Sequence, residues 1–136
     1  MAEDCLFCKI VAGELPSERV QEDEHTVAFM DINPWTRGHA LVIPRSHSAN
    51  IYEVGDDDLL HTAIAAKKLA LRMKERLACD GVNLLNASEP AAWQTVFHFH
   101  MHVIPRYEDD PLQVPVRPRQ AASEELARVA AELRRE

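Results

Sequence analysis

His98-Phe99-His100-Met101-His102-Val103-Ile104 is the most informative segment of this chain. Its histidines alternate with large apolar residues, and a period of two is typical of a β-strand whose successive side chains lie on opposite faces. We therefore expect His98, His100 and His102 to share one face of a strand, spaced roughly 6–7 Å apart. The apolar residues of the row, which we expect to point into a core, are Phe97, Phe99, Met101 and Val103.

A row of three imidazoles favours chemistry, because imidazole is a nucleophile, a proton carrier and a metal ligand near neutral pH. Two uses compete: a three-histidine metal site, and a histidine nucleophile assisted by other histidines. Metal ligands normally come from several elements so that they can surround the ion, which neighbours on one strand cannot easily do. The pattern therefore favours catalysis, at least for His100.

Length and composition limit the class of protein. The chain has 136 residues, which suits one domain, and its net charge of −7 without a basic block argues against binding a nucleic acid polymer. The start, Met1-Ala2-Glu3-Asp4, is acidic and lacks a long apolar run, and no segment reaches transmembrane length. We expect a cytoplasmic protein without membrane association, in which the cysteines are thiols or metal ligands.

The remaining pattern predicts an α+β domain with a mostly antiparallel sheet. An acidic start, a basic end and an apolar stripe indicate one long helix over residues 57–77. A second, C-terminal helix is expected over 123–135, with Ser123 as its N-cap. Residues 5–13 suggest a short helix or turn, and 106–119, rich in proline, an irregular segment. The strands expected besides the histidine strand are 19–22, 26–31, 40–43 and 82–86.

The chain resembles the histidine-triad family, and within it the Hint-type hydrolases of the bacterial kind. The residues 98–104 fit the family's His-x-His-x-His signature, 38–47 fit its second signature segment, and 29–32 resemble its nucleotide-pocket strand. The resemblance covers residues 5–107. It implies a single HIT domain over 1–136 with a C-terminal extension at 108–136, and a HIT-like fold. That fold has a five-stranded, mostly antiparallel sheet, one long helix and shorter helices, and it forms a homodimer.

The resemblance also implies a mechanism. His100 would attack the α-phosphorus of a nucleotide derivative and form a nucleotidyl-histidine, which water then hydrolyses. The backbone carbonyl of His98 would fix the tautomer of His100. His102 would bind the phosphoryl oxygens, and His39 would support the site from a neighbouring strand.

The family pattern assigns a binding role to further residues. Asp31 matches the ribose anchor, although on its own it could equally cap the following turn. The residues matched to the purine-base pocket are Leu6, Phe7, Phe29 and Ile32, and those matched to the phosphate region are Asn86, Gln94 and Thr95. Trp93 departs from the pattern, because the family has glycine there. Glycine allows close backbone approach and unusual torsions, so the departure bears on the details of phosphate and leaving-group recognition and not on the nucleophile.

Cys5-x-x-Cys8 has the spacing of a metal-ligand pair, but alone it could also be a redox pair or two buried thiols. The resemblance adds His47 and His98, which would complete a closed Cys2His2 site for a structural Zn²⁺. No cofactor is then required for catalysis.

The function expected from the resemblance is hydrolysis of a purine nucleoside 5′-phosphoramidate to the monophosphate and an amine. Two alternatives remain open. One is cleavage of dinucleoside polyphosphates with the same nucleophile, which Arg106 would slightly favour as a cation near extra phosphates. The other is a zinc-stabilised nucleotide-binding module with little turnover.

Overall fold

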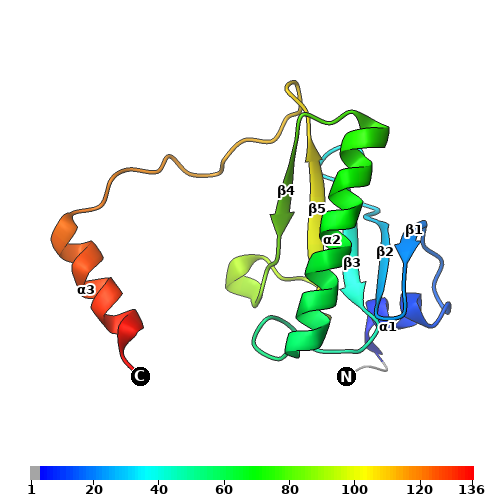
Figure 1. Cartoon of the computed structure of the whole chain (residues 1–136), viewed down its shortest axis with the longest axis horizontal. Helices are drawn as coiled ribbons and strands as arrows, with labels where there is room; N and C mark the ends of the chain where they lie inside the picture. The colour runs from blue at the N-terminus through cyan, green and yellow to red at the C-terminus, as the bar shows by residue number, and fades with distance from the viewer. Residues whose placement is uncertain (1–3) are drawn as a thin grey trace.

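The structure, a computed structural model, describes residues 4–136. Five antiparallel strands form one sheet in the order β1-β2-β3-β5-β4, which confirms the predicted fold (Figure 1). The strands are β1 (Arg19–Glu22), β2 (Thr26–Met30), β3 (Ala40–Pro44), β4 (Gly81–Leu85) and β5 (Met101–Arg106). The helices are α1 (Leu6–Val11), α2 (Asp56–Leu77), α3 (Ser123–Arg134) and the short 3-10 helix η2 (Pro90–Ala92).

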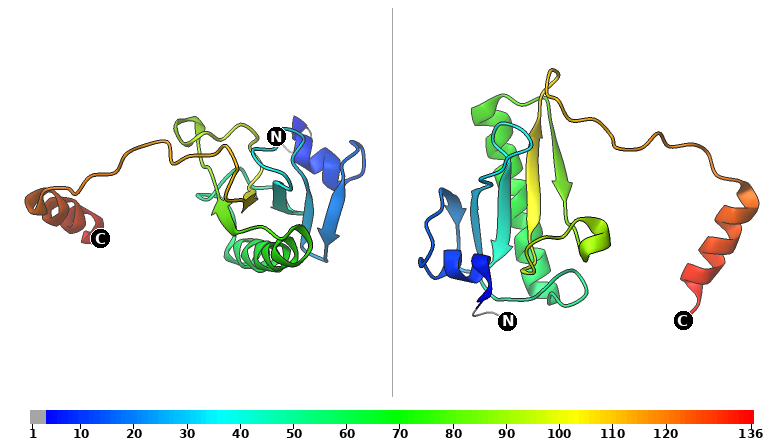
Figure 2. Two further views of the ribbon diagram at one scale, coloured as in Figure 1. Left: turned by 90° about the horizontal axis from the view of Figure 1, so that it is seen from above. Right: turned by 180° about the vertical axis from the view of Figure 1, so that it is seen from behind.

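The long helix α2 covers one face of the sheet, chiefly over β3 and β5 (Figure 2). Its acidic residues lie in the first turn and its basic residues in the last, as the helix dipole favours. It begins one residue before the predicted start and ends at Leu77 as predicted. The side chains between helix and sheet are Ala28, Ala40, Val42, Ala65, Ala66, Leu69, Met73 and Val103.

The opposite face of the sheet carries α1 and the histidines. Phe7 of α1 packs on Phe29 with an edge-to-face ring geometry at 5.3 Å between centroids. Val27, Leu41 and Ile43 complete this second apolar cluster. β2 and β3 therefore bury side chains on both faces, which explains their nearly continuous apolar sequence.

The predicted histidine strand was placed too early. β5 begins at Met101, so only His102 of the three histidines lies in the strand, and Phe97 is 41% exposed rather than in the core. The preceding backbone is bonded to loops instead of to a neighbouring strand. The N–H of Phe99 donates to the carbonyl of Ser48 at 2.7 Å, and the carbonyl of His100 accepts from the side chain of Asn86 at 2.9 Å.

The C-terminal segment leaves the sheet and ends in α3, which lies apart from the domain (Figure 1). Ser123 is the first helical residue and not the predicted N-cap. Ala122 takes that place with extended torsions, and its carbonyl accepts the first helical bond, from Leu126. Among residues 4–136, neither α2 nor any other helix combines the length and apolarity needed to cross a bilayer.

Gly38 fixes the turn that leads into β3. Its φ is +96°, and a Cβ there would lie 2.5 Å from Cδ1 of Leu77 and 3.1 Å from Cγ of Pro105. We expect Gly38→Ala to lower the free energy of unfolding by about 2–4 kcal/mol, through left-handed strain and overpacking. Gly81→Ala is the matched control, because the φ of Gly81 is not left-handed and a Cβ there would meet Arg106 Cβ at an ordinary contact distance of 3.9 Å. Equal urea midpoints for the two variants would contradict this account.

Candidate functional site

The buried histidines gather on the sheet face opposite α2, where β2, β3 and the segment before β5 meet. His39 and His98 are fully buried and His100 is 4% exposed. The rings of His100 and His102 lie 5.0 Å apart, and those of His39 and His102 lie 5.1 Å apart. The structure thus brings the four predicted catalytic histidines close together.

The ring of His100 is held in one tautomer. Its Nδ1 lies 2.7 Å from the backbone carbonyl of His98, and because a carbonyl only accepts, Nδ1 must carry the proton. Burial lowers the pKa of His100, which keeps the ring neutral. The opposite nitrogen, Nε2, therefore bears a free lone pair and can act as a nucleophile. The backbone carbonyl of His100 is also held, because it accepts a hydrogen bond from the side-chain amide of Asn86.

A chain of hydrogen bonds determines the tautomer of His102. The backbone N–H of Trp35 donates to Nδ1 of His39 at 3.0 Å, so the proton of His39 is on Nε2. That Nε2–H donates to Nδ1 of His102 at 2.9 Å, which leaves the proton of His102 on its Nε2. Burial, followed by the neighbouring His100 and His39, lowers the pKa of His102 to about 4. His102 is therefore a neutral N–H donor.

The carboxylate of Asp31 divides its contacts between a turn and the site. Oδ1 accepts from the N–H of Asn33 at 2.8 Å, as expected for a turn cap, while Oδ2 lies 3.6 Å from Nε2 of His39. Asp31, His39 and His102 are close enough to suggest a second metal group. The hydrogen-bond chain argues against it, because the nitrogen of His39 that would bind the metal carries its proton.

The residues predicted for the base pocket differ in exposure. Phe7 and Phe29 are buried, and the ring of Phe7 also meets His100 edge-on at 5.1 Å between centroids. Leu6 is 53% exposed and Ile32 is 89% exposed. The pair of buried rings thus forms a wall beside His100, while the two aliphatic side chains are open to solvent.

The segment before the histidines is held by Gln94. Its side-chain amide donates to the carbonyls of Ala49 and Val96, and its oxygen accepts from the N–H of Glu89 at 2.7 Å. This network supports Trp93, which has a φ of +77° at the position of the family's glycine. Such a conformation costs a residue with a Cβ about 1–2 kcal/mol. Thr95 is exposed, as is the indole of Trp93 at 63%.

The backbone N–H of Trp93 is not free for a phosphate, since it donates to the carbonyl of Pro90 at 3.0 Å. Arg106 is equally committed. Its guanidinium forms two bonds with Asp110, at 2.8 and 2.9 Å, and a third with Asn83 at 2.8 Å, at the far end of β5 from His102. The feature that slightly favoured polyphosphate cleavage is therefore absent from the site.

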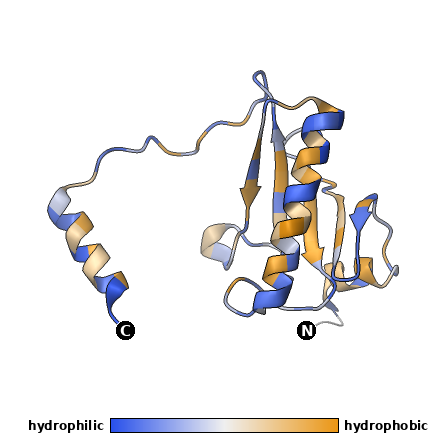
Figure 3. Ribbon diagram, in the orientation of Figure 1, coloured by the Kyte–Doolittle hydropathy of each residue, from blue (hydrophilic) through white to orange (hydrophobic). Residues whose placement is uncertain are grey.

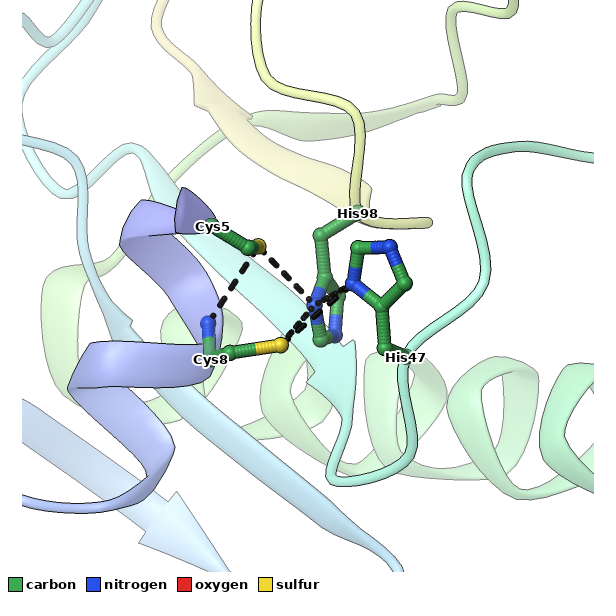
Figure 4. A group of neighbouring side chains, drawn as sticks. All are labelled: Cys5, Cys8, His47 and His98. Atoms are coloured by element: carbon green, nitrogen blue, oxygen red, sulfur yellow. Dashed lines mark hydrogen bonds between the residues drawn. The ribbon is translucent and has the colours of Figure 1, made fainter. Parts of the chain in front are cut away.

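Cys5, Cys8, His47 and His98 form a second group beside the first (Figure 4). Sγ of Cys8 lies 3.3 Å from Nδ1 of His47 and 3.5 Å from Nδ1 of His98, and Sγ of Cys5 also lies 3.5 Å from Nδ1 of His98. The two Nδ1 atoms lie 3.4 Å apart. A tetrahedral zinc ion with ordinary Zn–S and Zn–N bonds needs its ligand atoms roughly 3.3–3.8 Å apart. The four residues thus have both the chemistry and the spacing of a Cys2His2 zinc site.

The protonation of His98 also fits a metal ligand. Its Nε2 lies 2.8 Å from the carbonyl of Pro44, so the proton is on Nε2 and the Nδ1 lone pair points at the cysteines. Burial, with Cys5 alongside, raises the pKa of the Cys8 thiol to about 11. Two adjacent thiolates would therefore need a cation between them, which is what Zn²⁺ supplies.

Several contributors to the site are backbone groups that residue types do not reveal. The carbonyl of Pro44 and the N–H of Trp35 each set a histidine tautomer, yet the sequence marks them only as a strand end and a turn. The indole of Trp35 also stacks on His102, with ring planes 16° apart. No pattern in the sequence signalled this contact.

The hydrogen-bond chain makes a testable prediction about His102. Long-range ¹⁵N–¹H NMR should find it as the neutral Nε2–H tautomer down to about pH 5, because its pKa is lowered to about 4 and charging begins only as the pH approaches that value. His39→Leu removes the donor and should give a mixture of tautomers. Trp35→Phe keeps the backbone N–H and should preserve the wild-type tautomer of His102, although loss of the stacked indole will shift its resonances. A proton on Nδ1 of His102 in the wild type would refute the chain.

Comparison with known proteins identifies relatives over most of the chain. Residues 12–109 match the family model of the HIT domain. The chain is 48% identical over 106 residues to the protein named hit of Bacillus subtilis strain 168, which covers 78% of this chain and 73% of that protein.

Solved structures show the same similarity. A zinc-bound histidine triad family protein from Mycobacterium smegmatis is 38% identical, with a TM-score of 0.79 over 98% of this chain and 97% of that one. A histidine triad nucleotide-binding protein from Candida albicans is 32% identical, with a TM-score of 0.84 over 96% of this chain and 94% of that one. The chain therefore belongs to the histidine-triad (HIT) family, whose members are generally nucleotide-binding hydrolases or transferases.

Proposed function

We propose that this protein hydrolyses nucleotide derivatives at the α-phosphate, most readily a purine nucleoside 5′-phosphoramidate, through a covalent nucleotidyl-His100. The observation that carries the proposal is the hydrogen bond from Nδ1 of His100 to the carbonyl of His98, which leaves Nε2 as a neutral nucleophile in a buried site. Nucleophilic catalysis divides one difficult displacement into two easier ones.

In the first step Nε2 of His100 forms a bond to phosphorus while the bond from phosphorus to the amine nitrogen breaks. The amine takes up a proton as it leaves. In the second step water attacks the same phosphorus, loses a proton, and releases the monophosphate with neutral His100. The Nε2–H of His102 donates to a phosphoryl oxygen in both steps and stabilises the charge that develops there.

The proposed substrate contacts follow from the positions of the remaining predicted residues. Asp31 Oδ2 accepts from the ribose hydroxyls, and the rings of Phe7 and Phe29 back the base, with Leu6 and Ile32 at its exposed edge. Asn86 and Gln94 act through the backbone they hold rather than by direct contact. Thr95, being exposed, is the side chain in this segment that can reach a phosphate or leaving group.

We propose a structural Zn²⁺ on Cys5, Cys8, His47 and His98. Its support is the spacing of the four donor atoms, together with the zinc-bound relative from Mycobacterium smegmatis. The ion would tie α1 and the Pro44–His47 segment to the backbone that positions His100, and it supplies no chemistry to the reaction. Thiolate ligands suit a reducing compartment such as the cytoplasm.

We also propose that the protein works as a homodimer. β4 is an edge strand, since its partner in the sheet is β5, and Leu84 on it is 52% exposed. An apolar edge with unpaired backbone groups is a ready surface for a second copy.

Replacement of the nucleophile is the most direct test. With adenosine 5′-phosphoramidate as substrate, we expect His100→Ala to reduce AMP release by at least about 10³-fold, because no other group can form the covalent intermediate. Mass spectrometry of quenched wild-type reactions should detect the adenylylated chain. His61→Ala is the control, because His61 stacks on His25 on the surface and should turn over normally. If the wild type shows no turnover and His100→Ala binds the nucleotide as tightly as the wild type, the non-catalytic alternative is favoured.

The metal proposal predicts about one zinc per chain by elemental analysis. Cys8→Ser should lose the metal and lower the melting temperature, because it removes a ligand that links α1 to the sheet. Cys79→Ser is the matched control, since Cys79 lies outside the cluster. Equal zinc content in both variants would rule out this ligand set.

A further inference from the structure

One helix covers only part of the five-stranded sheet. α2 packs mainly on β3 and β5, and beside its C-terminal half a groove of about 340 Å³ lies open toward the start of β1 and the end of β2. The apolar side chains of this groove come from the strands and from α2: Val20, Met30, Leu69, Met73 and Leu77. An apolar sheet surface of this kind calls for a second helix to cover it.

The rim of the groove is positively charged. Arg37, Arg72 and Arg76 line it, and no carboxylate does. Within residues 4–136, none of the three guanidinium groups forms an ion pair. In a chain with a net charge of −7, three unpaired arginines around an apolar floor fit an occupant that is apolar on one side and acidic beside it.

α3 has the apolar side that such an occupant needs, and no other element within residues 4–136 covers it. All of its side chains are exposed apart from the half-buried Ala130, and Leu126, Val129 and Leu133 form a stripe at the spacing of one helix face (Figure 3). Its charges are nearly balanced, because Glu125 pairs with Arg128 and Glu132 pairs with Arg135, which leaves Glu124 as a carboxylate that can face the arginines of a groove. An amphipathic helix of twelve residues is marginal in water unless its apolar face is buried.

α3 does not occupy the groove of its own chain. The chain leaves β5 beside Arg37 and Gly38 of the groove, but it then runs past β4, to the edge of the sheet away from β1 (Figure 1, Figure 2). Asp110 fixes this exit by bonding Arg106 and the N–H groups of Tyr107 and Leu112. α3 therefore lies beyond the β4 edge, which is where a second copy sits in the proposed homodimer.

We infer that the C-terminal arm is exchanged between two copies, with the apolar stripe of α3 docked in the groove between α2 and the β1–β2 edge of its partner. Each copy then supplies the second helix that the other's sheet lacks, and Glu124 at the start of α3 is available to the arginines at the rim. The inference rests on the proposed homodimer. The superpositions over 96% and 98% of the chain extend into α3, so the arm is shared with solved relatives.

Self-association of the full-length protein is the first test. We expect Leu126→Glu/Leu133→Glu to dimerise at least about ten-fold more weakly than the wild type in analytical ultracentrifugation, because two apolar side chains can no longer be buried. Ala131→Glu adds the same type of charge on the opposite face of α3 and should behave as the wild type. Circular dichroism establishes that all variants are folded.

Cross-linking shows where the arm docks. All chains carry Cys79→Ser. Chains with Val20→Cys in the groove are mixed with chains that bear a different tag and one cysteine in the stripe of α3 (Leu126→Cys, Val129→Cys or Leu133→Cys). A short bismaleimide is then added. We expect a link between the two tags for at least one stripe position, above the background of the parent chain. Chains carrying both cysteines, at high dilution, report docking within one chain.

The outcomes separate the two proposals. A monomeric wild type overturns the homodimer and the exchange together. A dimer that Leu126→Glu/Leu133→Glu leaves intact, a link confined to single chains, or no link from any stripe position overturns the exchange alone. None of these results bears on AMP release, which tests the catalytic proposal separately.

Discussion

The site depends on how His98 is held. Its ring is fixed by the carbonyl of Pro44 at 2.8 Å and faces the two cysteines, while its own carbonyl fixes the ring of His100 at 2.7 Å. One residue therefore connects the metal-binding group to the proposed nucleophile through its side chain and its backbone. An ion bound between the cysteines and His98 would hold the residue whose carbonyl orients the proposed nucleophile, without entering the proposed reaction.

Local sequence pattern predicted much of the fold. Continuous apolar runs marked β2 and β3 because those strands are buried on both faces, and graded charge with an apolar stripe marked α2 almost to the residue. The resemblance to the family added what local pattern lacks, namely which distant residues meet. Cys5 and His98 are 93 positions apart, and spacing alone left three interpretations of the cysteine pair open.

The features that could not be predicted depend on contacts that residue type alone does not reveal. Alternation at 97–103 indicated a strand. The N–H of Phe99 and the carbonyl of His100 are instead bonded to Ser48 and Asn86, so the strand begins only at Met101. Arg106 suits a phosphate site by residue type, but its guanidinium is bound to the carboxylate of Asp110, four positions later. Trp35 acts through its N–H, a group that every residue except proline has, so no sequence motif can mark it.

The groove beside α2 and the histidine site share a short segment of the chain. Arg37 and Gly38 line the groove, and the next residue is His39, which sets the tautomer of His102 on the other face of the sheet. Gly38 packs against Leu77 of α2 without room for a Cβ. One tightly packed turn therefore contributes to the apolar groove on one face and to the hydrogen-bond chain on the other, and a side chain at position 38 would disturb both.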